Sequence, residues 1–162
     1  MIRTSFSQMS ATTRIPLLLL TCLAIGGCGD SSTEPPTQGS SFQLQLVDNS
    51  GLPAPLWAKL GGQVQMNAAT LQPHEPGKMR DVREFRETYP GGFALSRDST
   101  IVNVEISGAR YIITRPHPNG ALTRVDTGTF ENGLLVVPTT LDYRATMGVD
   151  LKRVELKYTV AQ

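Results

Sequence analysis

The sequence predicts an all-β domain, either a single up-and-down β-barrel or an antiparallel β-sandwich. In several segments apolar and polar residues alternate, which places every second side chain on one face of a strand. Clusters of Gly, Pro, Asn and Ser separate these segments at short intervals. Many short strands joined by such turns are typical of sandwiches and barrels.

Several segments carry the strand pattern. In chain order they are residues 42–46, 63–66, 102–106, 111–113, 134–137 and 153–160. The last segment is the clearest, because apolar residues occupy every second position from Val154 to Val160 and polar residues lie between them. Gly108 permits a bend or a bulge between the third and fourth segments. Turns are predicted at residues 49–51, 73–77, 90–92, 116–120 and 132–133.

Residues 79–89 fit two patterns. Arginine and glutamate stand twice at the i,i+4 spacing that stabilises a helix, as Arg80–Glu84 and Arg83–Glu87. As a strand, the segment would place its odd-numbered residues from 83 to 89 on one face. Strand is favoured over helix because the flanking residues have the composition of hairpin turns.

The N-terminus has the regions of a bacterial export signal. Arg3 and Arg14 are the only charged residues before Asp30. Residues 15–25 are mostly apolar, and their length suits the apolar region of a signal peptide, roughly 7–15 residues, but not a bilayer-spanning helix of about 20. Two glycines, residues 26–27, follow this run and are small enough for a signal peptidase.

Residues 25–28, Ile-Gly-Gly-Cys, resemble the lipobox of bacterial lipoproteins. The resemblance implies cleavage after residue 27, a thioether-linked diacylglycerol on Cys28 and acylation of the new amino terminus. Two or more acyl chains hold a protein stably on a membrane. Cys22 is a weaker candidate, because cleavage there would shorten the apolar run severely. An ordinary secretory signal and an uncleaved anchor are the alternatives.

Gly29 follows the cysteine, where many Gram-negative lipoproteins retained at the inner membrane have Asp. The resemblance therefore implies a lipid-anchored envelope protein at the outer membrane, facing the periplasm. Residues 29–41 contain no large apolar side chain and predict a flexible tether. The expected organisation is a signal peptide at 1–27, the acylated cysteine and a disordered tether at 28–41, and one β domain at 42–162.

Composition narrows the set of partners. Cleavage would remove Arg3 and Arg14 from 15 basic residues, leaving 13 against 14 acidic ones. Because no basic or acidic block is present, nucleic acid is not an expected partner, and neither are anionic lipid headgroups. Cys22 would leave with the signal and Cys28 would take the lipid, so no disulfide is expected and an apolar core must stabilise the domain.

Two parts of the domain resemble the lipocalin-like domains of small bacterial lipoproteins. Residues 51–56, Gly-Leu-Pro-Ala-Pro-Leu, match the turn that follows the first strand of such domains. Residues 126–137 match their later hairpin, in which an Asp-x-Gly-x-apolar strand leads through a glycine turn into an apolar strand. The resemblance implies a lipocalin-like barrel. Since the family largely lacks an assigned activity, it transfers no active site.

No catalytic or metal-binding motif is present, so neither catalysis nor a cofactor or metal is expected. His74 and His117 lie far apart in the sequence in proline-bounded loops, without metal-ligand spacing. Asp81, Glu84 and Glu87 each have an arginine nearby, which favours a solvated, salt-bridged face over a pair of hydrolytic carboxylates. An envelope hydrolase therefore ranks third among the functions considered.

The leading functional expectation is a small apolar or amphipathic ligand inside the barrel, and a non-catalytic protein–protein interaction module in the envelope is the alternative. Eight-stranded barrels hold either side chains or one small ligand. The aromatic residues are candidates for lining such a cavity, and in a small domain they more often fill the core: Trp57, Phe85, Tyr89, Phe93, Tyr111, Phe130, Tyr143 and Tyr158.

Overall fold

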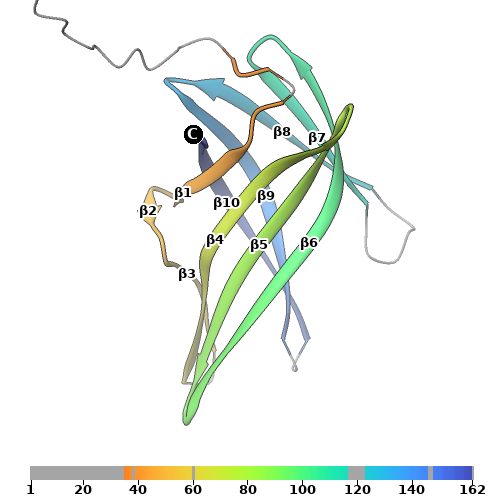
Figure 1. Cartoon of the computed structure of the whole chain (residues 1–162). Coiled ribbons are helices and arrows are strands. Elements are labelled where there is room, and N and C mark those ends of the chain that lie inside the picture. The colour runs from red at the N-terminus through yellow and green to blue at the C-terminus, as the bar shows by residue number, and fades with distance from the viewer. Residues whose placement is uncertain (1–34, 38, 60, 117–122, 146–147, 162) are drawn as a thin grey trace, which may run out of the picture. The chain divides into compact units, whose positions relative to one another are not determined.

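The computed structural model describes residues 35–37, 39–59, 61–116, 123–145 and 148–161. The strands are β1 (Phe42–Val47), β2 (Ser50–Gly51), β3 (Ala54–Lys59), β4 (Gly62–Glu75), β5 (Lys78–Tyr89), β6 (Gly92–Ser107), β7 (Arg110–Pro116), β8 (Thr123–Glu131), β9 (Leu134–Ala145) and β10 (Gly148–Val160). Eight of them, β1 and β4 to β10, form a closed antiparallel barrel (Figure 1). The predicted all-β barrel is confirmed and is consistent with a lipocalin-like barrel, so the sandwich alternative is not adopted.

The barrel is a meander closed by its first strand. Each strand from β4 to β10 pairs antiparallel with the next, and β1 lies between β10 and β4. The contact of β1 with β4 is short, because it consists of Phe42 opposite Leu71 and Gln43 opposite Thr70. Two further strands extend this sheet: β2 pairs with β1, and β3 pairs with the part of β4 that β1 does not reach.

A filled core occupies the middle of the barrel. Alternate residues along the strands point inward, as the sequence period predicts. The rings of Phe42 and Tyr111 meet edge to face, with centroids 5.8 Å apart and an interplanar angle of 87°. The largest fully buried side chains are Tyr111, Tyr158, Phe42, Leu44, Met66, Leu71, Ile113, Leu135, Leu141, Leu156, Val102 and Val137.

The strand alternative for residues 79–89 is correct, since β5 pairs with β6 from Lys78 to Tyr89 and with β4 from Lys78 to Thr88. At Gly108 the chain does not form the expected bend or bulge within a strand but reverses its direction in a hairpin turn. The residue has a φ of 57° and lies in a tight reversal that joins Ser107 to Arg110 across the β6–β7 hairpin. The turns expected at 90–92 and 132–133 are hairpin connections as well.

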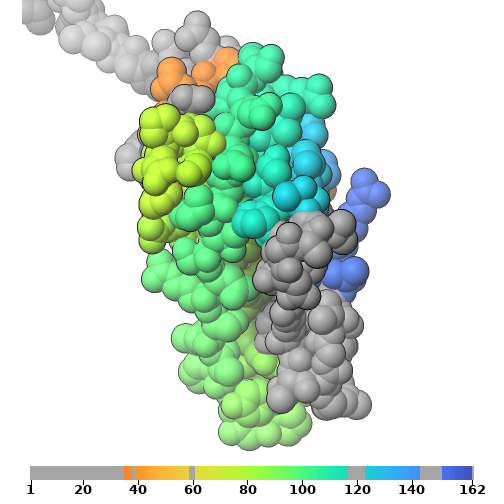
Figure 2. Space-filling model, turned by 90° about the vertical axis from the view of Figure 1, so that its right-hand side faces the viewer, coloured from red at the N-terminus to blue at the C-terminus, as the bar shows by residue number. Residues whose placement is uncertain are grey.

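The barrel wall is uneven because two ladders are short. β6 pairs with β7 only from Asn103 to Ser107, and β8 pairs with β9 only from Thr129 to Glu131. The β5–β6 hairpin pairs over its full length, and Figure 2 shows its green surface extending below the teal β7. Where β8 leaves its ladder, a Cβ on Gly128 would lie 2.9 Å from Val137 Cγ2, so glycine permits the close approach of the two strands.

A search of the described residues for a helix of sufficient length and hydropathy to cross a bilayer finds none.

Candidate functional site

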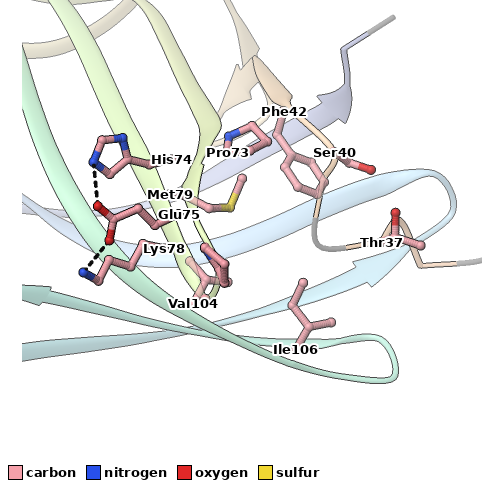
Figure 3. Close-up of a pocket in the computed structure, with 12 residues that line it drawn as sticks. Thr37, Ser40, Phe42, Pro73, His74, Glu75, Lys78, Met79, Val104 and Ile106 are labelled. Atoms are coloured by element: carbon pink, nitrogen blue, oxygen red, sulfur yellow. Dashed lines mark hydrogen bonds and ion pairs between the residues drawn. The ribbon is translucent and has the colours of Figure 1, made fainter.

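A pocket with an apolar floor lies at the end of the barrel where the chain enters β1 (Figure 3). Its volume is about 370 Å³, which is near the lower end of the range for small-molecule sites, roughly 300–1,000 Å³. We call it the apolar pocket. It is lined by Thr37, Ser40, Phe42, Pro73, His74, Glu75, Pro76, Gly77, Lys78, Met79, Val104 and Ile106.

The β4–β5 hairpin forms one wall of the apolar pocket. Pro76 and Gly77 make its turn, and Gly77 adopts a φ of 73°, a conformation that glycine reaches without steric cost. The backbone N–H of Val104 donates to the carbonyl of Gly77 at 2.8 Å, so the turn is fixed to β6. A β-bulge between Pro73 and Glu75 interrupts the ladder at His74, and such bulges redirect side chains.

The segment that precedes β1 forms a second wall. Thr37 and Ser40 line the pocket, and the N–H of Ser40 donates to the carbonyl of Thr37 at 3.1 Å. The hydroxyl of Tyr111, inside the barrel, donates to the carbonyl of Pro36 at 3.0 Å. The N–H of Ala161 donates to the carbonyl of Ser41 at 2.8 Å. The C-terminal part of the expected tether therefore contacts the barrel at several points.

The floor of the pocket is apolar and its edge is charged. Phe42, Met79 and Val104 are buried in the floor, whereas the side chains of Glu75 and Lys78 are 54% and 44% exposed. Lys78 Nζ donates to Glu75 Oε2 at 2.8 Å, and this hydrogen bond, with the charges of Lys78 and His74, lowers the pKa of Glu75. Such a site can bind an apolar body and leave a polar end at the surface.

A second, larger cavity lies farther along the barrel, beside the short ladders. Its volume is about 690 Å³, and we call it the polar cavity. It is lined by Asp81, Arg83, Phe85, Ser96, Asp98, Ser99, Thr100, Arg115, Pro116, Arg124, Thr140, Asp142 and Leu151.

The polar cavity overturns one expectation from the sequence. Asp81 is not part of a solvated face, because its side chain is only 2% exposed and forms ion pairs with Arg83 and Arg115. Arg115 Nε also donates to Asp126 Oδ2 at 2.9 Å, and Thr139 Oγ1 donates to the same oxygen at 2.8 Å. Glu84 does lie outside, with its carboxylate 3.6 Å from Arg97 Nε. The interior network was missed because its members come from four different strands.

The aromatic candidates divide into three groups. Phe85, Tyr111, Phe130 and Tyr158 are buried, and Trp57 packs against the core. Tyr89 and Phe93 are exposed. The side chain of Tyr143 lies outside the described residues, as do Cys28 and His117. Of the eight, Phe85 lines the polar cavity, and none is among the residues that line the apolar pocket.

The residues of the apolar pocket gave only a weak signal in the sequence. Phe42 is the first large apolar residue after the tether, but nothing in the pattern connects it with Met79, Val104 or Ile106 on distant strands. Within the described ranges, no three His, Cys, Asp or Glu side chains are grouped so that they could hold a metal ion.

Comparisons with known proteins add no further constraint on the site. No protein-family model matches the chain, and no curated protein or solved structure matches it. The function must therefore be inferred from the geometry and chemistry of the cavities.

Proposed function

We propose that this protein is a lipid-anchored envelope protein that binds a small apolar or amphipathic molecule in the apolar pocket. The observation that carries the proposal is the pocket itself, about 370 Å³ in volume, with a buried floor that includes Phe42, Met79 and Val104. Apolar pockets with a few polar groups at the edge are the usual form of small-molecule sites. Burial of an apolar body there would be favourable by roughly 25 cal/mol per Å².

The anchor is the second part of the proposal. The lipobox resemblance at residues 25–28 supports acylation of Cys28 and a location at the outer membrane, facing the periplasm. From Cys28 to Pro35 the chain can reach at most roughly 25 Å, at 3.3–3.6 Å per residue. Thr37, which lines the pocket, follows two residues later, so the ligand site would be within a short distance of the membrane. An apolar ligand could pass between the two.

The proposed activity is binding without catalysis. The charged residues that line the pocket, His74, Glu75 and Lys78, lie at its edge and interact with one another. His74 Nε2 is 3.8 Å from Glu75 Oε1, and Glu75 accepts the hydrogen bond from Lys78. These pairs suit the recognition of a polar end group better than the activation of a nucleophile.

Photolabelling tests the proposal on the complete lipoprotein purified in detergent. The probe is 3-trifluoromethyl-3-phenyldiazirine, which is small, apolar and uncharged. Labelled residues are mapped by peptide mass spectrometry, and we expect labelling at Met79, Val104 and Ile106. Ile106→Trp would fill the pocket and reduce labelling of Met79 by about tenfold, equivalent to roughly 1.4 kcal/mol of binding free energy.

Ile112→Trp is the matched control, because Ile112 is partly exposed and lies between the buried Tyr111 and Ile113, on the other face of β7. This variant should keep the labelling of Met79. Equal labelling in the two variants, or labelling confined to residues on the outside of the barrel, would contradict the proposal.

The second candidate is a non-catalytic interaction module. Its support is the exposed apolar surface of the β5–β6 hairpin, where Tyr89, Phe93 and Leu95 are 47%, 56% and 66% exposed. Arg86 stacks over Phe93, with its Cζ 4.5 Å from the ring centroid. Organic extraction of the purified lipoprotein distinguishes the candidates, because a stoichiometric small molecule favours the carrier. A protein partner without such a molecule favours the interaction module.

A further inference from the structure

Two arginines that line the polar cavity, Arg83 and Arg124, have buried N–H groups without a hydrogen-bond acceptor among the described residues. Arg83 lines the cavity with a side chain only 10% exposed. Its Nη2 lies 3.0 Å from Asp81 Oδ2 without hydrogen-bond geometry, and its Nε has no hydrogen-bond partner among the described residues. Arg124 Nε is likewise buried without a hydrogen bond, 3.5 Å from Asp126 Oδ1. Buried donors of charged groups are costly to leave unpaired.

The other contacts of these arginines hold them in place. Arg124 Nη1 donates to the carbonyl of Thr140, and Nη2 donates to Thr139 Oγ1 at 3.2 Å. Arg124 thus connects β8 to β9 beyond the end of their ladder. Arg115 donates to both Asp81 and Asp126. The guanidinium groups at the cavity are therefore preorganised by the fold.

The charges are distributed unevenly with depth. The buried part of the cluster contains Arg83 and Arg115 with Asp81 and Asp126, and the half-buried Arg124 adds a positive charge. Burial lowers the pKa of Arg124, Asp126 raises it, Arg115 and Arg83 lower it, and Asp142 raises it. The three guanidinium groups and these carboxylates therefore lie close together. Among the fully buried groups the charges balance, and the half-buried Arg124 and Asp142 add one charge of each sign, so the site favours an anionic group together with a cationic one.

The outer part of the lining contains negative charge. Asp98 and Asp142 also line the cavity, and both are more exposed than Asp81. Carboxylates at the entrance oppose the entry of a polyanion and attract a positive group. The lining therefore matches a molecule with one anionic group and one cationic group.

Water alone is the simplest alternative occupant of such a cluster. A water molecule accounts for about 30 Å³ of liquid volume, whereas the cavity has about 690 Å³. Phe85 and Leu151 add apolar surface to the lining, and Leu151 is 69% exposed. A cavity of this size with a mixed apolar and charged lining has room for a small organic molecule as well as for water.

We propose that the polar cavity is a second binding site, which takes a small zwitterionic organic acid such as an amino acid. Its carboxylate binds Arg83 and Arg124, its ammonium group lies near Asp98 and Asp142, and its apolar part contacts Phe85 and Leu151. No residue that lines this site also lines the apolar pocket, so the proposal does not depend on the proposed carrier function.

Nuclear magnetic resonance on the complete lipoprotein in detergent tests the site with three probes of one shape. The probes are L-phenylalanine, phenylacetate, which lacks the ammonium group, and phenethylamine, which lacks the carboxylate. The Nε–H signals of Arg83 and Arg124 are followed at constant chloride concentration. We expect saturable shifts with phenylalanine and phenylacetate, tighter binding of phenylalanine by about tenfold, and no saturable shift with phenethylamine.

Variants identify the groups responsible. Arg124→Gln should abolish the response of Arg83 to phenylalanine, and Asp98→Asn with Asp142→Asn should remove the preference for phenylalanine over phenylacetate. Arg80→Gln is the matched control, because Arg80 is exposed on the other face of β5. If Arg124→Gln does not fold, Arg83→Lys retains the charge and should weaken binding of the carboxylate without abolishing it.

Several results would contradict the proposal of a second binding site. The first is the absence of any saturable shift with phenylalanine and phenylacetate. Another is an equal response to phenethylamine, because the ammonium alone would then suffice. Unchanged binding in folded Arg124→Gln would place the carboxylate elsewhere.

Discussion

Two buried tyrosines differ in one hydrogen bond. Tyr111 and Tyr158 are both almost completely buried in the core. The hydroxyl of Tyr111 donates to the carbonyl of Pro36, whereas that of Tyr158 has no hydrogen-bond partner among the described residues. Burial raises the pKa of both phenols. An unpaired buried hydroxyl is unfavourable, so Tyr158 lowers the stability that its ring provides.

Opposite effects are expected when each hydroxyl is removed. Tyr158→Phe should raise the free energy of unfolding by about 1 kcal/mol, and Tyr111→Phe should lower it by about 1 kcal/mol. Urea denaturation at pH 7 measures both. Destabilisation by Tyr158→Phe would mean that its hydroxyl has a partner.

The pH dependence follows from the same burial. The pKa of Tyr158 in the folded state is above the ordinary value of 10.0, with burial as the largest cause. Its contribution to stability is therefore complete below pH 10 and is lost as the pH rises through the folded-state pKa. The Tyr158→Phe variant should lose less stability than the parent protein above this pH.

At the scale of elements, β3 is held in the barrel wall by few hydrogen bonds. It pairs with β4 on one side, and a bulge between Pro55 and Trp57 interrupts this ladder. On the other side, Lys152 Nζ of β10 donates to the carbonyl of Leu56 at 2.7 Å. The Lys152 side chain thus donates a hydrogen bond to a carbonyl at the bulge, which has no partner residue in the β3–β4 ladder.

Lys152→Met should release this side of β3. We expect a loss of about 1.5–3 kcal/mol, the range for hydrogen bonds of charged groups, and faster hydrogen exchange of the amides at 54–58. Arg153→Met is the control, because Arg153 is exposed on the same strand. Equal exchange in the two variants would show that the hydrogen bond contributes nothing to the position of β3.

The elements were predictable where one face is buried. Residues 153–160 alternate clearly because they have a core on one side and solvent on the other. Residues 92–98 of β6 were missed because they are exposed on both faces and carry no such period. Residues 54–59 were missed because Pro55 and the bulge break the alternation. For residues 79–89, pairing with two neighbours decided between helix and strand.

At the scale of the whole molecule, the closed barrel has a filled middle, and the part that the structure describes also contains the apolar pocket and the polar cavity. Core side chains from Leu44 to Tyr158 fill the interior, as is usual for small eight-stranded barrels. The apolar pocket lies where the segment of Pro36 and Thr37 meets the barrel, and the polar cavity lies where β8 separates from β9.

The anchor is a prediction at this scale. Replacement of Cys28 by Ala should release the protein from membranes into the soluble periplasmic fraction, because no acyl chain can then be attached. Cell fractionation followed by immunoblotting measures the distribution. Mass spectrometry of the N-terminal peptide of the parent protein should show the lipid on Cys28. Continued membrane association of the Cys28→Ala variant would contradict the lipobox assignment.

The sequence by itself determined the β class, the turns at 90–92 and 132–133 and the inward face of several strands, because these depend on residues that are close in the chain. The tertiary structure decided the closure of the ring through Phe42 and Leu71, the inward position of Asp81 and the composition of both cavities. These features depend on residues far apart in the chain, whose contacts arise only when the strands are in register. Local patterns and turns constrain the register within a hairpin, but they do not determine which strands distant in the chain become neighbours.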